Sequence, residues 1–201
     1  MMKRSVSDER MSEIRHCFNL IKKDKMEGSV LEFGMFEGWS MSEMILHCRN
    51  NQMYHRFYGF EGFQGMPETA DRWNKGDGFS SYENTCSLLE QKLGTTYELT
   101  VIPGLFKDTL TVELQKTISK AVLVHVDCDL YSSTVDVLAF CFPFFQKGTF
   151  IVFDEYIEGH EKRAWDEFIR KQLFSFEVFI VSISDGVRVA REQGQYIFRI
   201  K

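Results

Sequence analysis

Short apolar segments alternate with amphipathic segments along almost the whole chain, and this alternation restricts the fold more than any other feature. Seven segments have the length and composition of β-strands: 29–33, 56–60, 97–104, 121–127, 147–156, 176–183 and 194–200. Segments with helical spacing of apolar residues lie between most of them: 8–25, 40–49, 83–93, 109–119, 133–146 and 161–173. Strands that are apolar on both faces and alternate with helices predict a doubly wound α/β fold, with a mostly parallel seven-stranded sheet and helices on both faces. Because no clear helix separates the last two strands, we expect them to form an antiparallel edge, with the C-terminal strand as the edge strand.

The composition favours a single globular domain that does not bind nucleic acid. The 201 residues suffice for one sizeable core, and no linker or repeat divides the segment 1–201. The net charge of -5 and the dispersed Lys and Arg residues argue against a nucleic-acid partner. The five cysteines form no C-x-x-C pair, which fits the reducing cytoplasm. We expect no signal peptide and no membrane partner, because no apolar run approaches the roughly 20 residues of a spanning helix.

Acidic residues stand at the predicted carboxyl ends of four strands: Glu32, Glu61, Asp127 and Asp154. Ligands of open parallel sheets bind outside the carboxyl ends of the strands. The sequence therefore predicts that these acids surround a ligand site.

A glycine-rich turn, Glu32-Phe-Gly34-Met-Phe-Glu-Gly38, joins the first strand to the next helix. Glycine allows the backbone to approach a ligand closely. The spacing differs from the dinucleotide fingerprint G-x-G-x-x-G, and no P-loop lysine follows. An acid at the start of the turn suits an ammonium group better than a pyrophosphate, although an ordinary tight turn explains the segment equally well. Glu61, at the end of the second strand, could accept hydrogen bonds from both hydroxyls of a ribose.

Three carboxylates follow the fourth and fifth strands. If these strands are neighbours, Asp127, Asp154 and Glu155 converge and repel one another unless a cation or a proton neutralises them. Oxygen ligands of this kind suit Mg²⁺. Asp129 could then act as a general base. Alternatively, Asp127 binds backbone N–H groups and Asp129 caps the helix that begins near Ser132.

Three other residues near the predicted site are of types that can carry chemistry. Cys128 has no histidine that the sequence pairs with it, so we do not expect a nucleophile. His125 lies within an apolar strand and is expected to be a core histidine with satisfied hydrogen bonds. His160 is expected at the mouth of the site, either as a substrate contact or as the start of a helix.

Six segments together resemble the macrocin O-methyltransferase (TylF-like) family of class I S-adenosylmethionine-dependent methyltransferases: VLEFGMFEGWS, YGFEGFQGMPE, IPGLFKDTL, VDCDLYSST, KGTFIVFDEY and KRAWDEF. The resemblance runs from about residue 30 to the last strand. It implies a Rossmann-like fold and an enzyme of natural-product or surface-glycan tailoring.

The resemblance also assigns roles to residues. The cofactor S-adenosylmethionine would be held by Glu32, Gly34, Gly38, Ser40, Glu61, Phe63, Phe106 and Asp127. Mg²⁺ would be held by Asp127, Asp154 and Glu155, and catalysis would fall to Asp127 and Asp129, the latter as general base. We expect substrate contacts from Tyr131, Tyr156 and His160. Residues 1–28 and the irregular loop 62–82 are candidate lids.

Two departures from the family pattern bear on function. The family has two aspartates where this chain has Asp154 and Glu155, so whether the enzyme needs a metal is left open. The segment before residue 30 is shorter than in many family members, so the identity of the acceptor is left open. The first hypothesis is a Mg²⁺-assisted O-methyltransferase acting on a sugar or another polyhydroxylated small molecule. The rivals are a metal-independent methyltransferase, and a nucleotide-binding dehydrogenase or non-catalytic module on the same fold. Whether the chain forms a homo-oligomer is left open by the sequence.

Overall fold

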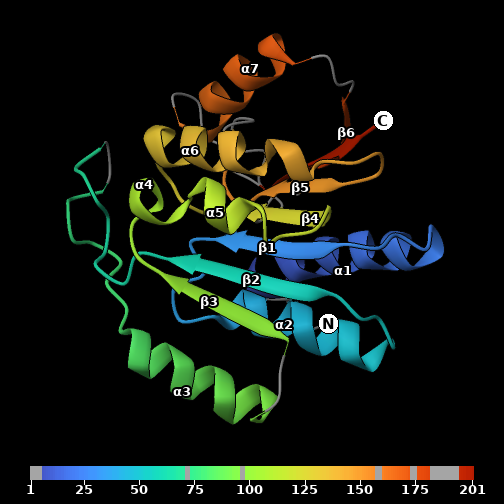
Figure 1. Ribbon diagram of the computed structural model, residues 1–201, viewed down its shortest axis with the longest axis horizontal. Coiled ribbons are helices and arrows are strands. Elements are labelled where there is room, and N and C mark those ends of the chain that lie inside the picture. Colours follow the sequence, from blue (N-terminus) through green and yellow to red (C-terminus); the bar gives the residue numbers. More distant parts are fainter. Residues whose placement is uncertain (1–5, 71–72, 96–97, 157–159, 173–175, 182–194) are drawn as a thin grey trace.

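The computed structural model describes residues 6–70, 73–95, 98–156, 160–172, 176–181 and 195–201 and is built on one central sheet (Figure 1). The strands of this sheet are β1 (Ser29–Phe33), β2 (Arg56–Glu61), β3 (Leu99–Pro103), β4 (Ala121–Val126), β5 (Phe150–Phe153), β6 (Phe176–Val181) and β7 (Tyr196–Ile200). Their order is β3-β2-β1-β4-β5-β7-β6. The predicted seven-stranded sheet is confirmed.

The first five strands run parallel, and β4 pairs directly with β5 as the acid cluster required. β7 runs antiparallel to both β5 and β6. The last two strands therefore form the antiparallel part of the sheet, but the C-terminal strand lies inside and β6 forms the edge. Of the predicted strand 176–183, residues 182–183 lie outside the described residues, as do residues 1–5 of the N-terminal segment 1–28.

Helices cover both faces of the sheet (Figure 1). One face carries α1 (Val6–Lys23), α2 (Trp39–Asn50) and α3 (Tyr82–Leu93). The other carries α4 (Phe106–Thr109), α5 (Val112–Gln115), α6 (Tyr131–Cys141), the 3₁₀ turn η1 (Phe142–Phe144) and α7 (Glu161–Lys171). The doubly wound fold predicted from the alternation of strands and helices is confirmed.

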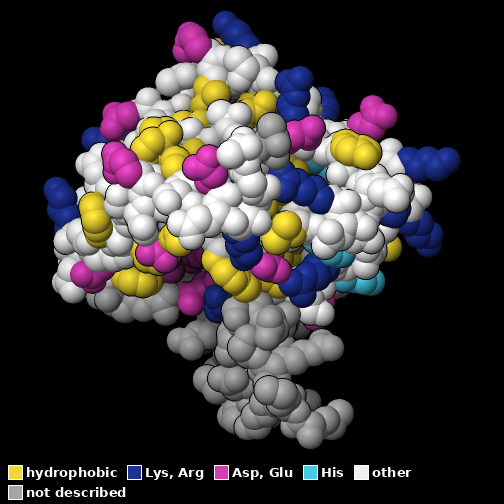
Figure 2. All heavy atoms as spheres, turned by 90° about the horizontal axis from the view of Figure 1, so that it is seen from below, with side chains coloured by type: hydrophobic (Ala, Val, Ile, Leu, Met, Phe, Trp, Pro, Cys, Tyr) yellow, Lys and Arg dark blue, Asp and Glu magenta, His cyan; other side chains and the backbone are white. Residues whose placement is uncertain are grey.

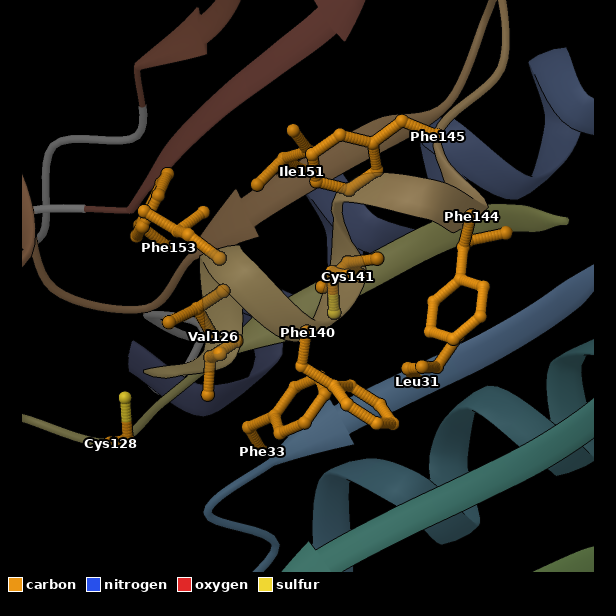
Figure 3. Close-up of a cluster of buried hydrophobic side chains, with 14 of the residues drawn as sticks. Leu31, Phe33, Val126, Cys128, Phe140, Cys141, Phe144, Phe145, Ile151 and Phe153 are labelled. Atoms are coloured by element: carbon orange, nitrogen blue, oxygen red, sulfur yellow. The ribbon is translucent and has the colours of Figure 1, made fainter. Parts of the chain in front are cut away.

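Two hydrophobic cores lie between the sheet and these helix layers. Successive strand residues point to opposite faces, so Leu31 and Phe33 enter the core under α6 while Val30 enters the core under α1 and α2. Figure 3 shows Phe140 of α6 beside Phe33, and the two rings meet edge to face with centroids 6.3 Å apart. Phe33 also stacks on Phe60 of β2 with centroids 4.4 Å apart, which fixes the ends of β1 and β2 against each other.

Two helix predictions need correction. The predicted helix 109–119 is wrong, because two four-residue helices, α4 and α5, take its place. The Thr111 hydroxyl accepts a hydrogen bond from the Leu114 N–H (3.2 Å) and so starts a new helix where one helix was expected to continue. The predicted helix 133–146 runs instead from Tyr131 to Cys141, because Pro143 lacks the N–H that continues a helix and turns the chain into η1.

The surface agrees with the dispersed charge of the sequence. Figure 2 shows acidic and basic side chains interspersed over the face it presents. Within the described ranges, every helix falls short of the length or the apolar character that crossing a bilayer requires.

Candidate active site at the carboxyl ends of the strands

The strand register brings the predicted acids to one edge of the sheet. Asp127 follows β4, and its N–H donates to the carbonyl of Phe33 (2.9 Å). Asp154 follows β5, and its N–H donates to the carbonyl of Val126 (3.0 Å). The sheet ladder thus continues one residue beyond the strands, and it fixes both acids relative to the glycine turn after β1.

Gly34 makes the closest approach at this edge. It has a φ of +86°, and a Cβ at this position would lie 1.8 Å from the carbonyl oxygen of Asp127. Only glycine therefore allows β1 and β4 to end this close together. Gly38 also has a positive φ, of +76°, and leads into α2. The glycines were predicted from the needs of a ligand, but the structure gives Gly34 a packing role as well.

Glu32 is fully buried and links the glycine turn to β4. Its Oε1 accepts hydrogen bonds from the Ser40 hydroxyl (2.6 Å) and from Nδ1 of His125 (2.8 Å). Its Oε2 has no hydrogen-bond partner within the described part of the chain. A buried carboxylate oxygen without a donor is costly, so this atom is suited to a donor that arrives with a ligand.

Glu61 bonds one backbone N–H of the glycine turn and one of the loop that follows β2. One carboxylate oxygen accepts from the N–H of Phe36 (2.8 Å), and the other accepts from the N–H of Phe63 (3.1 Å). Phe63 meets Tyr82 edge to face, with centroids 5.3 Å apart. Phe106 begins α4 and packs edge-on against Phe33. The residues predicted to hold the cofactor therefore lie along one edge, and their contact with it stays a prediction.

His125, Asp127 and Asp154 form the group whose ligand atoms all lie within 4.8 Å of one another. Burial raises the pKa of Asp127 well above its ordinary range, and the negative charge of Asp154 raises it further. Burial works to lower the pKa of His125, but the carboxylates of Asp154 and Glu32 outweigh it and raise this pKa to about 10. His125 is thus a charged partner of two acids, and its Nε2 lies 3.9 Å from Oδ1 of Asp154.

Arg10 of α1 brings a second positive charge to this group. Its Nη1 donates a hydrogen bond to Oδ2 of Asp154, and its Nη2 lies 3.8 Å from Oε1 of Glu155. Burial works to raise the pKa of Asp154, but His125 and Arg10 outweigh it and lower this pKa. Glu155 is not a member of the group within 4.8 Å, so its predicted role as a metal ligand stays a prediction.

Asp129 stands in a strained backbone conformation, with a φ of +58°. Three of the five described non-glycine residues with positive φ lie at this edge: Phe36, Phe63 and Asp129. Such strain is frequent at functional sites. The alternative in which Asp129 serves as the helix cap is wrong, because α6 begins at Tyr131 and the residue in the N-cap position is Leu130. Its role as a general base stays a prediction.

The three predicted substrate contacts lie in different surroundings. The Tyr131 hydroxyl donates to Glu167 of α7 (2.7 Å). Tyr156 is buried in the aromatic core, where it stacks on Tyr196 with centroids 4.4 Å apart. His160 occupies the N-cap position of α7 and is also buried. Each of these residues thus has an environment of its own within the protein, and its contact with a substrate stays a prediction.

Sequence reasoning missed two members of the site. His125 was expected to be an ordinary core residue, although strand alternation places it on the same face of β4 as Asp127, two residues on. Arg10 carried no recognisable signal, because it lies 144 residues from Asp154 in the sequence.

The comparisons with known proteins fit this geometry. The sequence profile of the macrocin O-methyltransferase (TylF) family matches residues 2–184. The chain belongs to this family. This macrocin O-methyltransferase family member is therefore an S-adenosylmethionine-dependent methyltransferase, and the resemblance drawn from the sequence is confirmed.

Two curated relatives illustrate the family. The first is the demethyldecarbamoylnovobiocin O-methyltransferase of Streptomyces niveus, which is 26% identical over 192 residues covering 89% of this chain and 72% of the relative. The second is the 8-demethyl-8-(2,3-dimethoxy-alpha-L-rhamnosyl)-tetracenomycin-C 4'-O-methyltransferase of Streptomyces olivaceus, which is 24% identical over 160 residues. That match covers 74% of this chain and only 60% of the relative. Among solved structures, the O-methyltransferase NovP shares the fold with a TM-score of 0.76 and 21% identity, covering 95% of this chain and 79% of NovP.

Proposed function

We propose that this methyltransferase transfers a methyl group from S-adenosylmethionine to a hydroxyl of a sugar or another polyhydroxylated small molecule, with a divalent cation such as Mg²⁺ assisting. The observation that carries the proposal is that the glycine turn and the group of His125, Asp127 and Asp154 share one edge of the sheet. A place for the donor thus adjoins a place for an acceptor. The rhamnosyl group in the name of the tetracenomycin relative supports a sugar hydroxyl as acceptor.

The cofactor would be held by the residues of the glycine turn and of β2. Gly34 and Gly38 keep side chains away from the turn, and the unpartnered Oε2 of Glu32 suits the cofactor's ammonium group. The backbone N–H groups of Phe36 and Phe63 fix the carboxylate of Glu61, whose remaining lone pairs suit ribose hydroxyls. The sulfonium supplies a methyl group that is already activated, so the protein has to align the acceptor oxygen and help remove its proton.

The donor set fits a divalent cation. Asp127 and Asp154 offer carboxylate oxygens close together. Burial and then the negative charge of Asp154 raise the pKa of Asp127, and a bound cation would offset both effects. Glu155 is proposed as a third oxygen ligand. A bound cation would lower the pKa of a hydroxyl that it coordinates. Asp129 would accept the hydroxyl proton on a carboxylate oxygen, and residues 1–28 and 62–82 would exclude water.

One observation favours the metal-independent alternative. Arg10 already donates to Asp154 and lies near Glu155, so these two acids have a cationic partner within the protein. In the metal-independent alternative, Asp154 and Glu155 only orient the substrate. The third hypothesis, a dehydrogenase or a non-catalytic module, is set aside by the family to which the chain belongs.

Calorimetry with S-adenosylmethionine, S-adenosylhomocysteine and NAD tests the cofactor. We expect heat of binding with the two sulfur compounds and none with NAD; a protein that binds neither sulfur compound would end the proposal. Screening glycosylated acceptors by mass spectrometry for the mass gain of a methyl group identifies the substrate. Turnover with and without EDTA then separates the assisted reaction from the metal-independent one.

Variants of the two central acids test the assigned roles. We expect Asp127→Ala and Asp129→Asn to abolish turnover while most of the affinity for S-adenosylhomocysteine remains. Asp136→Asn is a matched control, because this acid lies exposed on α6 outside the site. Near-normal turnover by either site variant would contradict the role given to that residue.

A further inference from the structure

Helix α1 is anchored in the core, so the position of Arg10 is set by the fold. Five side chains of α1 are buried with exposed fractions of 1% or less: Met11, Ile14, Cys17, Phe18 and Ile21. They pack in the core that also receives α2 and one face of the sheet. Arg10 directly precedes the first of these anchors. Because α1 is packed in the core, the guanidinium of Arg10 lies beside the acids without any movement of a lid.

Both oxygens of Asp154 face nitrogen atoms of the protein. Oδ2 accepts the hydrogen bond from Nη1 of Arg10, and Oδ1 lies 3.9 Å from Nε2 of His125. Nη2 of Arg10 is turned toward Glu155. One guanidinium thus spans the two acids that follow β5, and this arrangement satisfies them without any other cation.

A divalent cation would have to share these acids with Arg10. Mg²⁺ and Mn²⁺ need a carboxylate oxygen at close range, and the oxygen of Asp154 on the α1 side is already bonded. Arginine side chains stay charged in proteins, so a guanidinium does not make room for a metal by losing a proton. Two cations on one carboxylate repel each other, and the side chain of Arg10 must turn away before the metal can take that oxygen.

We propose that Arg10 is a positioning residue that holds Asp154 and Glu155 in the place of a divalent cation and thereby weakens the affinity of the site for the metal. The inference rests on the proposed function for its meaning in catalysis. The contacts of Arg10 with Asp154 and Glu155, from which it is argued, are independent of that function. When the metal or a substrate engages Asp154, the guanidinium is released from it. Binding of a metal and the contact between Arg10 and Asp154 therefore oppose each other.

Binding of Mn²⁺, followed by electron paramagnetic resonance, tests this directly on the full chain without cofactor or substrate. An opposite charge close to a carboxylate changes proton affinity by about 1–3 pKa units, so we expect Arg10→Met to bind Mn²⁺ at least about tenfold more tightly than the wild type. Arg10→Lys keeps the charge and should stay near the wild-type affinity. Arg15→Met is the matched control, because Arg15 lies on the same helix and bonds Glu43 of α2 (2.9 Å), away from the site.

Each outcome of the Mn²⁺ titrations either supports or contradicts the role given to Arg10. Tighter binding in Arg10→Met alone supports the proposal. Equal affinities in wild type and Arg10→Met, including no binding by either, would overturn it, and so would an equal gain in Arg15→Met. If Arg10→Met does not fold by circular dichroism, Arg10→Gln takes its place with the same expectation. Calorimetry of the wild type with S-adenosylhomocysteine reports on the proposed function independently, so either idea can fail while the other stands.

Discussion

Gly34→Ala is the substitution that tests the convergence of β1 and β4 most directly. A non-glycine residue at a φ of +86° costs about 1–2 kcal/mol in backbone strain. The added Cβ would also lie 1.8 Å from the carbonyl oxygen of Asp127, where real contacts are longer than 3.0 Å. Because that oxygen belongs to the backbone, the two strand ends must separate rather than a side chain rotate.

Separating the two strand ends lowers the free energy of unfolding, and a second glycine variant serves as the control. The separation would break the bond from the N–H of Asp127 to the carbonyl of Phe33, and a lost buried hydrogen bond costs about 1–3 kcal/mol. Gly76→Ala has a similar φ, +93°, but its Cβ would meet nothing within 4 Å. The control therefore places a side chain at a positive φ without the clash, and Gly34→Ala should lose about 1–3 kcal/mol more in free energy of unfolding.

Urea unfolding of both variants, followed by circular dichroism, measures this difference, and titration with S-adenosylhomocysteine measures what it does to the site. We expect the larger loss of stability and of cofactor affinity in Gly34→Ala. Equal losses of stability in the two variants would refute the argument that packing against Asp127 demands this glycine.

Three further predictions concern single groups. Only Cys86 should react quickly with a thiol reagent at pH 8, because the other four of the five free cysteines are buried. Burial raises the pKa of Cys48, for example, to about 12. More than one fast-reacting thiol in the native protein would contradict this, and all five should react in denaturant. Glu61→Gln should weaken binding of S-adenosylhomocysteine about tenfold or more in calorimetry, since a hydrogen bond to a charged acceptor is worth about 1.5–3 kcal/mol; unchanged affinity would remove the ribose role. The pKa of His125 is raised to about 10, above the ordinary value of 6.5, so its charged contacts stabilise the fold fully below pH 6.5 and lose that effect as the pH rises through 10. The difference in free energy of unfolding between the wild type and His125→Gln, measured without added metal, should therefore shrink between pH 7 and pH 10, and a constant difference would contradict it.

The sheet was predictable because its signals are local. The segment 29–33 is a short apolar run bounded by glycines, and the structure gives β1 the same bounds. Once the strands are placed, the rule that parallel strands end at one edge brings Asp127 and Asp154 together without further information. The helix predicted for 109–119 failed because a local bond of the Thr111 hydroxyl competes with helix continuation, and spacing alone does not reveal such a bond.

The electrostatics of the site were not predictable in the same way. The charge on His125 depends on two acids from other strands, and the partner of Asp154 comes from the first helix of the chain. These contacts join residues that are far apart in the sequence and are fixed only by the packing of whole elements. The order of the last two strands was hidden for a related reason, because both β6 and β7 have the composition of interior strands.

The position of β7 has a consequence for the order of assembly during synthesis. β6 joins the sheet through β7, and β7 occupies the place beside β5. While the chain emerges from the ribosome, β6 is made first but has no strand to pair with until residues 196–200 follow. The half of the sheet next to Asp154 therefore closes last, and truncation before residue 196 would leave the growing edge at β5 open to pairing with other chains.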